Sequence, residues 1–73
     1  MIYLSHNMKN QLSKRLTILI QESGKTQNLI STELHIRKQK LSNWKTGFTE
    51  PSLDDVIMLA LYFHVSTDYL LGL

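Results

Sequence analysis

The sequence TQNLISTELHIRKQKLSNWKTG, residues 26–47, predicts two short helices joined by a tight turn. In the first helix, Ile30 and Leu34 are spaced so that both side chains lie on one face. In the second helix, Leu41 and Trp44 are likewise spaced to share a face. The two apolar faces can therefore pack on one shared core, which makes this pair of helices the centre of the fold.

The second helix also has a polar outer side made of cations and amides. Such groups can supply the donors and acceptors that match base edges in the DNA major groove. The alternative is an ordinary solvated helix face that binds nothing. The side chains concerned are Lys38, Gln39, Ser42 and Asn43, with Arg37 and Lys40 beside them.

Positive charge is concentrated in the same region. The whole chain carries a formal net charge of +2, which is weak evidence for an anionic partner. Residues 25–48, however, contain five Lys or Arg and one Glu, whereas residues 49–73 contain four Asp or Glu and neither Lys nor Arg. A polyanion would accordingly be held by the central helices.

Length and composition limit the chain to a single small domain. Seventy-three residues, 42% of them apolar, suffice for one globular core but not for two. The absence of cysteine excludes a disulfide scaffold and cysteine-based metal sites. No apolar run approaches the length of a signal-peptide core or a membrane span, so we expect a soluble cytoplasmic protein with no membrane contact.

An enzyme is the least expected class of function. His6, His35 and His64 are too far apart for a local metal-ligand motif, and no carboxylate neighbours them in an acid–base pattern. The sequence also contains no glycine-rich phosphate loop. We therefore expect no catalytic residue, no metal and no cofactor.

Three further helices complete a predicted five-helix all-α architecture. Each helix follows an apolar pattern at helical spacing and has a residue suited to begin or end it. The predicted helices are residues 9–23 ended by Gly24, 27–34 capped by Thr26, 38–46 ended by Gly47, 53–63 opened by a Ser52/Asp55 capping box, and 67–71 capped by Ser66.

The N-terminal residues 1–8 show no clear helical period. They are predicted to form an arm, flexible or briefly extended, before a single domain at residues 9–73. One interpretation is that translation begins at Met8 and the earlier residues contribute little. The other is an arm that reaches a partner subunit.

The predicted helix at residues 53–63 has more apolar side chains than one core can cover. A series from Leu53 through Leu59 to Phe63 has the core spacing. The apolar side chains left over, together with two near the C-terminus, favour a homodimer interface, and ordinary exposure of apolar side chains is the alternative. These interface candidates are Ile57, Met58, Leu61, Tyr62, Leu71 and Leu73.

These features together resemble the lambda-repressor-like helix-turn-helix family of Cro/C1 type, also called XRE. The resemblance covers about residues 12–72, nearly the whole chain. Each part of the pattern is weak alone, but the order and spacing of the parts are specific. The pattern consists of Thr26-Gln27, Leu34-x-Ile36, Leu41-Ser42-x-Trp44, Gly47 with Pro51, and Val65-Ser66-x-Asp68-Tyr69-Leu70-Leu71-Gly72.

The resemblance implies a small dimeric transcriptional regulator, a repressor, that reads an inverted-repeat operator in double-stranded DNA with residues 38–46 in the major groove. An antitoxin that binds both DNA and a partner protein is the alternative. The implied base-reading residues are Lys38, Gln39 and Asn43. The implied contacts to the DNA backbone, or to backbone and bases, are Gln27, Arg37, Lys40, Ser42 and Thr46.

The chain departs from the family pattern at several places. His35 stands where glycine is usual in the turn, and Arg37 stands where a capping Ser or Thr is usual. The family also pairs an Arg late in the first helix with a Glu after the Trp, and here those positions are Ile20 and Lys45. Replacing both partners of such a pair can be nearly neutral. We therefore expect the same fold with a different internal contact, and Lys45 free as a further phosphate-seeking cation.

Overall fold

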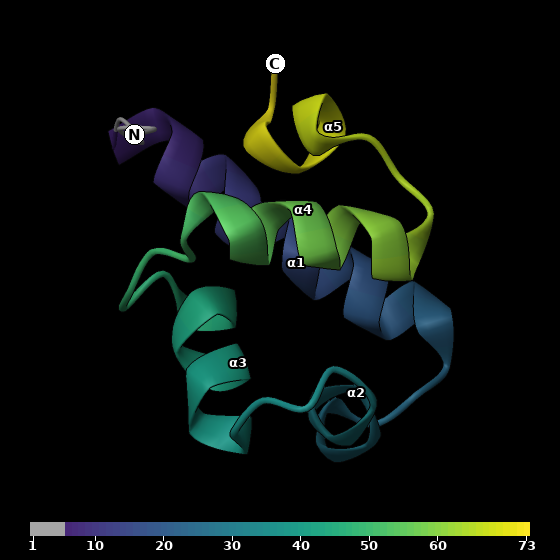
Figure 1. Cartoon of the computed structure of the whole chain (residues 1–73). Coiled ribbons are helices and arrows are strands. Elements are labelled where there is room, and N and C mark those ends of the chain that lie inside the picture. Colours follow the sequence, from purple (N-terminus) through teal and green to yellow (C-terminus); the bar gives the residue numbers. More distant parts are fainter. Residues whose placement is uncertain (1–5) are drawn as a thin grey trace.

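Five helices form in the part of the chain that the structure describes, residues 6–73, with side chains described from Gln11 onward. The structure is a computed structural model, shown in Figure 1. No strand occurs within these residues, so the predicted all-α architecture is confirmed. The helices are α1 (His6–Ser23), α2 (Gln27–Glu33), α3 (Lys38–Thr46), α4 (Leu53–Phe63) and α5 (Thr67–Leu71).

The helix boundaries agree with the sequence patterns at most positions. The bounds of α3, α4 and α5 are the predicted ones. Helix α2 ends at Glu33, one residue early, because Leu34 is already its C-cap. Helix α1 begins at His6, so residues 6–8, expected in the arm, belong to the helix instead. They contain neither proline nor glycine to interrupt it. The rest of the predicted arm, residues 1–5, lies outside the described residues.

Side-chain caps begin three of the helices. The hydroxyl oxygen of Thr26 accepts a backbone N–H at the start of α2, and the hydroxyl oxygen of Ser66 does the same for α5. Ser52 and Asp55 form a full capping box at α4, in which each side chain accepts the backbone N–H of the other (3.2 and 3.1 Å). A cap of this kind typically contributes about 1 kcal/mol. The caps confirm the predicted starts of these three helices.

A residue with positive φ follows each of the five described helices. Gly24 and Gly47 follow α1 and α3 with φ of 70° and 80°, as predicted. Histidines take the same conformation elsewhere, His35 after α2 with φ of 57° and His64 after α4 with φ of 58°. A side chain makes this conformation costlier than it is for glycine, so both histidines carry backbone strain.

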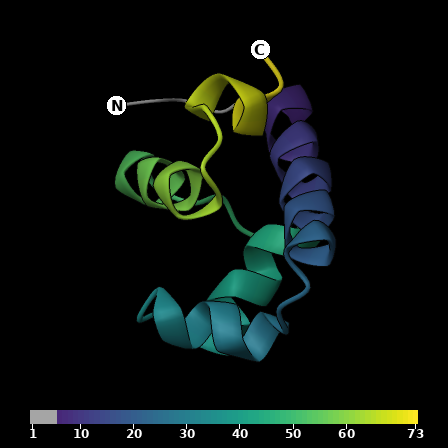
Figure 2. The same ribbon diagram turned by 90° about the vertical axis from the view of Figure 1, so that its right-hand side faces the viewer.

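Two helices pack directly on α1, and the other two pack mainly on those two. Helices α3 and α5 both pack against α1, and α2 packs against α3. In Figure 2, α1 extends along one side of the molecule, from α5 at one end to α2 and α3 at the other, with α4 on the opposite side. The α2–α3 pair therefore forms one end of the molecule, far from α5.

The core consists of aliphatic side chains from all five helices and one tryptophan. Leu53, predicted at a core position, is 45% exposed because it is the first residue of α4, where that helix reaches the molecular surface. Within residues 6–73, none of the helices combines the length and apolarity needed to cross a membrane. The core residues are Leu12, Leu16, Leu19, Ile20, Ile30, Leu34, Leu41, Trp44, Val56, Leu59, Ala60, Leu70 and Leu71.

Candidate nucleic-acid interface

The turn between α2 and α3 is fixed by backbone hydrogen bonds. The His35 N–H donates to the Thr32 carbonyl oxygen (3.1 Å), and the Ile36 N–H donates to the Ser31 carbonyl oxygen (3.0 Å). His35 supplies the positive φ that the reversal requires, and the partly buried side chain of Ile36 packs against the core. The turn therefore sets the direction of α3 relative to α2 (Figure 1).

Helix α3 has one buried face and one exposed face. Leu41 and Trp44 form the buried face, with 0% and 2% of their surfaces exposed. Since successive residues of an α-helix are rotated by about 100°, Gln39, Asn43 and Thr46 lie on the opposite side. We call these three residues the outer face of α3. Two of the three are amides, so the outer face carries both donors and acceptors.

Cations flank the outer face. Lys38 and Lys40 are exposed and lie on its two sides, and Ser42 lies half-buried between Lys38 and the outer face. The Lys40 ammonium is 5.6 Å from the centre of the Trp44 ring, which keeps this cation close to α3. The structure thus brings Lys38, the predicted base-reading lysine, to the edge of the outer face rather than to its centre.

The two amides of the outer face are hydrogen-bonded to each other. Gln39 Nε2 donates to Asn43 Oδ1 over 2.8 Å, across one helical turn. Gln39 is exposed, whereas Asn43 is half-buried. The loop after α3 also contacts Asn43, because its backbone carbonyl oxygen accepts the N–H groups of Phe48 (2.9 Å) and Thr49 (3.3 Å). Asn43 is therefore fixed at its backbone and engaged at its side chain.

Arg37 occupies the N-cap of α3 without making a side-chain cap. Its backbone carbonyl oxygen accepts the N–H groups of Lys40 (3.0 Å) and Leu41 (3.3 Å), so the helix begins normally. The guanidinium is on an exposed residue next to uncapped backbone N–H groups. Because helix N-termini attract phosphate oxygens, this end of α3 combines two groups that favour a phosphate.

Lys45, predicted as a further phosphate-seeking cation, contacts a side chain of α2. Its Nζ donates to Gln27 Oε1 over 3.4 Å, and the Lys45 side chain is half-buried between α2 and α3. Ile20, at the position where the family has the partner arginine, is a core residue with 7% of its surface exposed. The changed internal contact was therefore predicted correctly, although Gln27 was not named as the partner of Lys45. A neutral amide leaves the Lys45 charge in place, so a contact from Lys45 to phosphate stays a prediction. The contact turns the Gln27 carbonyl oxygen toward Lys45 and leaves the Nε2 group as a donor.

A hydroxyl contact missed by sequence reasoning holds the other end of α3. Ser13 Oγ donates to the backbone carbonyl oxygen of Lys45, which joins α1 to the last turn of α3. Thr46, predicted to contact phosphate, is exposed and donates from Oγ1 to the Asn43 carbonyl oxygen (3.3 Å). The hydrogen bond from Ser13 to Lys45 joins residues 32 positions apart, and such a contact leaves no periodic signal in the sequence.

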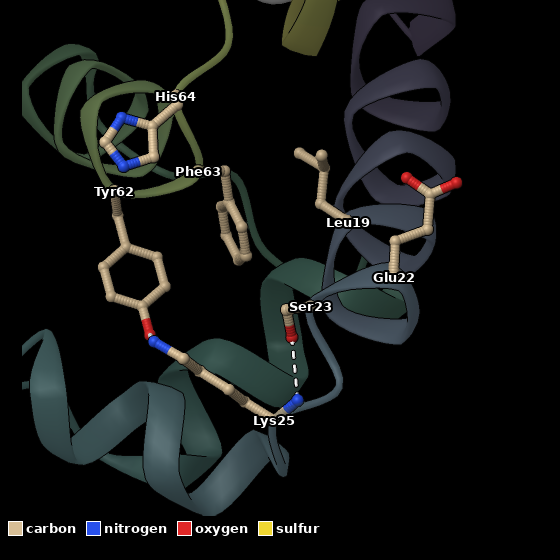
Figure 3. A pocket seen from close by; sticks show the side chains of 7 residues that line it. All are labelled: Leu19, Glu22, Ser23, Lys25, Tyr62, Phe63 and His64. Carbon is tan, nitrogen blue, oxygen red and sulfur yellow. Dashed lines mark hydrogen bonds between the residues drawn. The ribbon is translucent and has the colours of Figure 1, made fainter.

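A polar cluster beside a surface pocket was also missed. Lys25 Nζ donates to Glu33 Oε1 (2.9 Å) and to the Tyr62 hydroxyl oxygen (3.2 Å), and the Tyr62 hydroxyl donates to the same carboxylate. The three residues come from the α1–α2 connection, the end of α2 and the end of α4. Figure 3 shows the pocket, of about 280 Å³, lined by Leu19, Glu22, Ser23, Lys25, Tyr62, Phe63 and His64.

Hydrogen bonding and burial in this cluster shift three pKa values. The Tyr62 hydroxyl, followed by the Lys25 ammonium, lowers the pKa of Glu33, and the Glu33 carboxylate raises the pKa of Lys25. Burial, followed by the hydrogen bond to Glu33, raises the pKa of Tyr62. Since Lys25 and Glu33 form an ion pair, the positive charge of the central region is carried mainly by the α3 cations, Arg37, Lys38, Lys40 and Lys45.

The predicted dimer interface is only partly exposed. Leu71 was predicted wrongly, because α5 packs on α1 and leaves only 7% of this side chain exposed. Met58 and Tyr62 are partly buried against the core. Leu61 and Leu73 are each 72% exposed, and Ile57 is 43% exposed. Two of the predicted candidates, Ile57 and Leu61, form an exposed row on α4 together with Leu53, which the sequence had assigned to the core. We call these three residues, at successive helical turns, the α4 stripe.

Comparison with known proteins agrees with this arrangement of helices. The family model described as Helix-turn-helix matches residues 9–70. The HTH-type transcriptional regulator ImmR of Bacillus subtilis (strain 168) is 39% identical over 61 residues, which cover 84% of this chain and 48% of ImmR. The chain thus spans about half the length of this curated relative. No solved structure matches the chain significantly. From the family match and the identity to ImmR, the chain belongs to the helix-turn-helix family of Cro/C1 type, the XRE family.

Proposed function

We propose that this protein is a sequence-specific DNA-binding transcriptional regulator that inserts α3 into the major groove. The observation that carries the proposal is the position of the two amides, Gln39 and Asn43, opposite the buried residues Leu41 and Trp44. A helix with this division is anchored on one side and offers hydrogen-bonding groups on the other. The match to the helix-turn-helix family and the description of ImmR as a transcriptional regulator support the same function.

Phosphate contacts would position α3 in the groove. Gln27, at the first position of α2, has an amide donor beside a helix N-terminus, where phosphate oxygens are favoured. The charged contacts come from Arg37 and the lysines around α3, and Ser42 and Thr46 add hydroxyl donors. Contacts from these groups to phosphate do not read the DNA sequence directly, but they fix the register and orientation of α3 on the duplex.

We further propose a homodimer that represses transcription from an inverted-repeat operator in the cytoplasm. Two recognition helices of a helix-turn-helix dimer enter successive major grooves roughly 34 Å apart, which requires two-fold symmetric DNA. The α4 stripe is the proposed interface, because it exposes three apolar side chains on one helical face. Leu73, as exposed as Leu61, is a further candidate for the interface.

A salt titration of DNA binding tests the proposal. If a dimer neutralises about 6–10 phosphates, the logarithm of the affinity should fall with the logarithm of the salt concentration with a slope of roughly −5 to −9. Lys40→Ala should weaken binding to the operator and to random DNA alike, with a shallower slope. Lys14→Ala removes the same charge from an exposed position on α1 and is the matched control. A flat salt response would contradict the proposed function.

The exposed α4 stripe also favours a second candidate, an antitoxin that binds DNA and a partner protein. Light scattering coupled to size-exclusion chromatography separates the two proposals. A stable homodimer of the isolated protein supports the dimeric repressor. A monomeric or aggregating protein favours a foreign partner on the stripe, since the apolar surface would then remain uncovered.

A further inference from the structure

The hydrogen bond between Gln39 and Asn43 determines which groups the Gln39 amide has left to offer. One N–H of Gln39 Nε2 is directed at Asn43 Oδ1, 2.8 Å away. When the N–H trans to Oε1 makes this bond, the N–H cis to Oε1 and the carbonyl oxygen itself remain on one edge of the planar amide. This pair presents one donor and one acceptor side by side.

Adenine presents the complementary pair in the major groove, an acceptor at N7 and a donor at N6. Guanine presents two acceptors there, at N7 and O6. An amide held with its oxygen toward O6 of guanine would place two acceptors against each other. We propose that Gln39 reads an adenine in each operator half-site and that Asn43 is the positioning residue that holds the Gln39 amide in the adenine-reading orientation.

The structure assigns these unequal roles because the two side chains differ in exposure and in anchoring. Gln39 is exposed and can reach a base edge, whereas Asn43 is half-buried. The Asn43 backbone is fixed by the N–H groups of Phe48 and Thr49, so its side chain begins from a defined point. The terminal torsion of a glutamine is broad, and the hydrogen bond that Gln39 donates to Asn43, whose backbone is anchored, selects one orientation of the Gln39 amide.

The proposal predicts a specific effect of each Asn43 variant on base preference. It rests on the proposed DNA binding, and it concerns one position of the operator only. Asn43→Ala should reduce the preference for adenine over guanine at the Gln39 position by about two- to tenfold, the contribution of one hydrogen bond. Asn43→Asp keeps an oxygen that can accept from Gln39 Nε2, so adenine preference should persist even as the added negative charge weakens binding overall.

Selection from random DNA duplexes with the full chain tests both residues. The intact protein should select an adenine once in each half-site, with a preference over guanine of roughly 10- to 100-fold, and Gln39→Ala should abolish the preference at that position. Binding of each variant to random DNA, with an unchanged salt slope for Asn43→Ala, shows that the domain is folded. Intact protein that shows no steep salt dependence would instead refute the proposed function itself.

Two outcomes would overturn the inference while leaving DNA binding in place. In the first, Asn43→Ala changes the preference at another base position and leaves the Gln39 position untouched, so that Asn43 reads a base of its own. In the second, Asn43→Asp loses the adenine preference as fully as Asn43→Ala does. Retention of that preference in Asn43→Asp, with its loss in Asn43→Ala, supports the positioning role.

Discussion

The Tyr62 hydroxyl donates a hydrogen bond to the Glu33 carboxylate and thereby joins the end of α4 to the end of α2. Lys25, from the connection before α2, donates to both groups. The cluster links the pair of helices that carries the proposed DNA contacts to the helix that carries the α4 stripe. Because Lys25 and Glu33 are solvent-exposed, we expect the cluster to adjust stability modestly and to do so in a pH-dependent way.

The lowered pKa of Glu33 gives the pH dependence a definite sign. The folded protein favours the ionised carboxylate, so this stabilisation is present above the ordinary glutamate value near 4.5 and is lost as the pH falls through the lower folded value. Glu33→Gln should therefore lower the midpoint of urea unfolding at pH 7. Between pH 5 and pH 3 this midpoint should fall less in the variant than in the intact protein. Glu50→Gln, which removes the same charge from the exposed loop before α4, is the control. Equal pH profiles for Glu33→Gln and the intact protein would contradict the role of this carboxylate.

Arg37→Ser should improve stability while weakening DNA binding. A serine at the N-cap of α3 can accept a backbone N–H that Arg37 leaves without a side-chain cap, for a gain of about 1 kcal/mol in the free energy of unfolding. The same change removes one phosphate-seeking cation, so the salt slope of DNA binding should become shallower by about 1 per protomer. Urea unfolding and a salt titration measure the two effects independently. A variant that binds DNA as tightly as the intact protein would show that Arg37 makes no phosphate contact.

Replacing His35 by glycine should stabilise the turn between α2 and α3. His35 has φ of 57°, which glycine adopts without the clash of a side chain. Because glycine also loses more entropy on folding, the net gain should be about 0.5–1 kcal/mol. His64→Gly, at φ of 58°, should give a similar gain. Lys14→Gly, in the interior of α1, should instead cost about 0.5–1 kcal/mol. Destabilisation by His35→Gly would show that the imidazole makes a compensating contact.

Most of the fold was predictable because its signals are local. Thr26, Ser52 and Ser66 cap the helices that their sequence positions predicted, and the glycines after α1 and α3 take the expected positive φ. Such signals depend on a few neighbouring residues and on helical periodicity. The division of α3 into a buried and an outer face follows from the same periodicity, which is why Gln39 and Asn43 could be placed on the polar side of this helix from the sequence.

The missed contacts and the two wrong burial assignments arose where polar contacts or burial depend on how distant helices pack. Lys45 contacts Gln27, 18 residues away, and Lys25 contacts Tyr62, 37 residues away, so neither contact is visible in a local pattern. Leu71 was assigned to the surface because α5 has only five residues, too few for its periodicity to define a buried face. Leu53 was assigned to the core because its spacing fits, but a helix end can extend beyond the core it packs on.

Leu61→Lys should separate the proposed dimer into monomers. Leu61 is 72% exposed on the α4 stripe, and a lysine there would place two like charges near each other at a two-fold interface or bury them without partners. Light scattering should give the monomer mass, and binding to a half-site should persist with about half the salt slope of the dimer on the full operator. Ile18→Lys adds the same charge at a position on α1 that is 42% exposed and serves as the control. If Leu61→Lys remains dimeric while Ile18→Lys becomes monomeric, α1 rather than α4 carries the interface. If both variants remain dimeric, the exposed leucine at the C-terminus, Leu73, becomes the surface to substitute next.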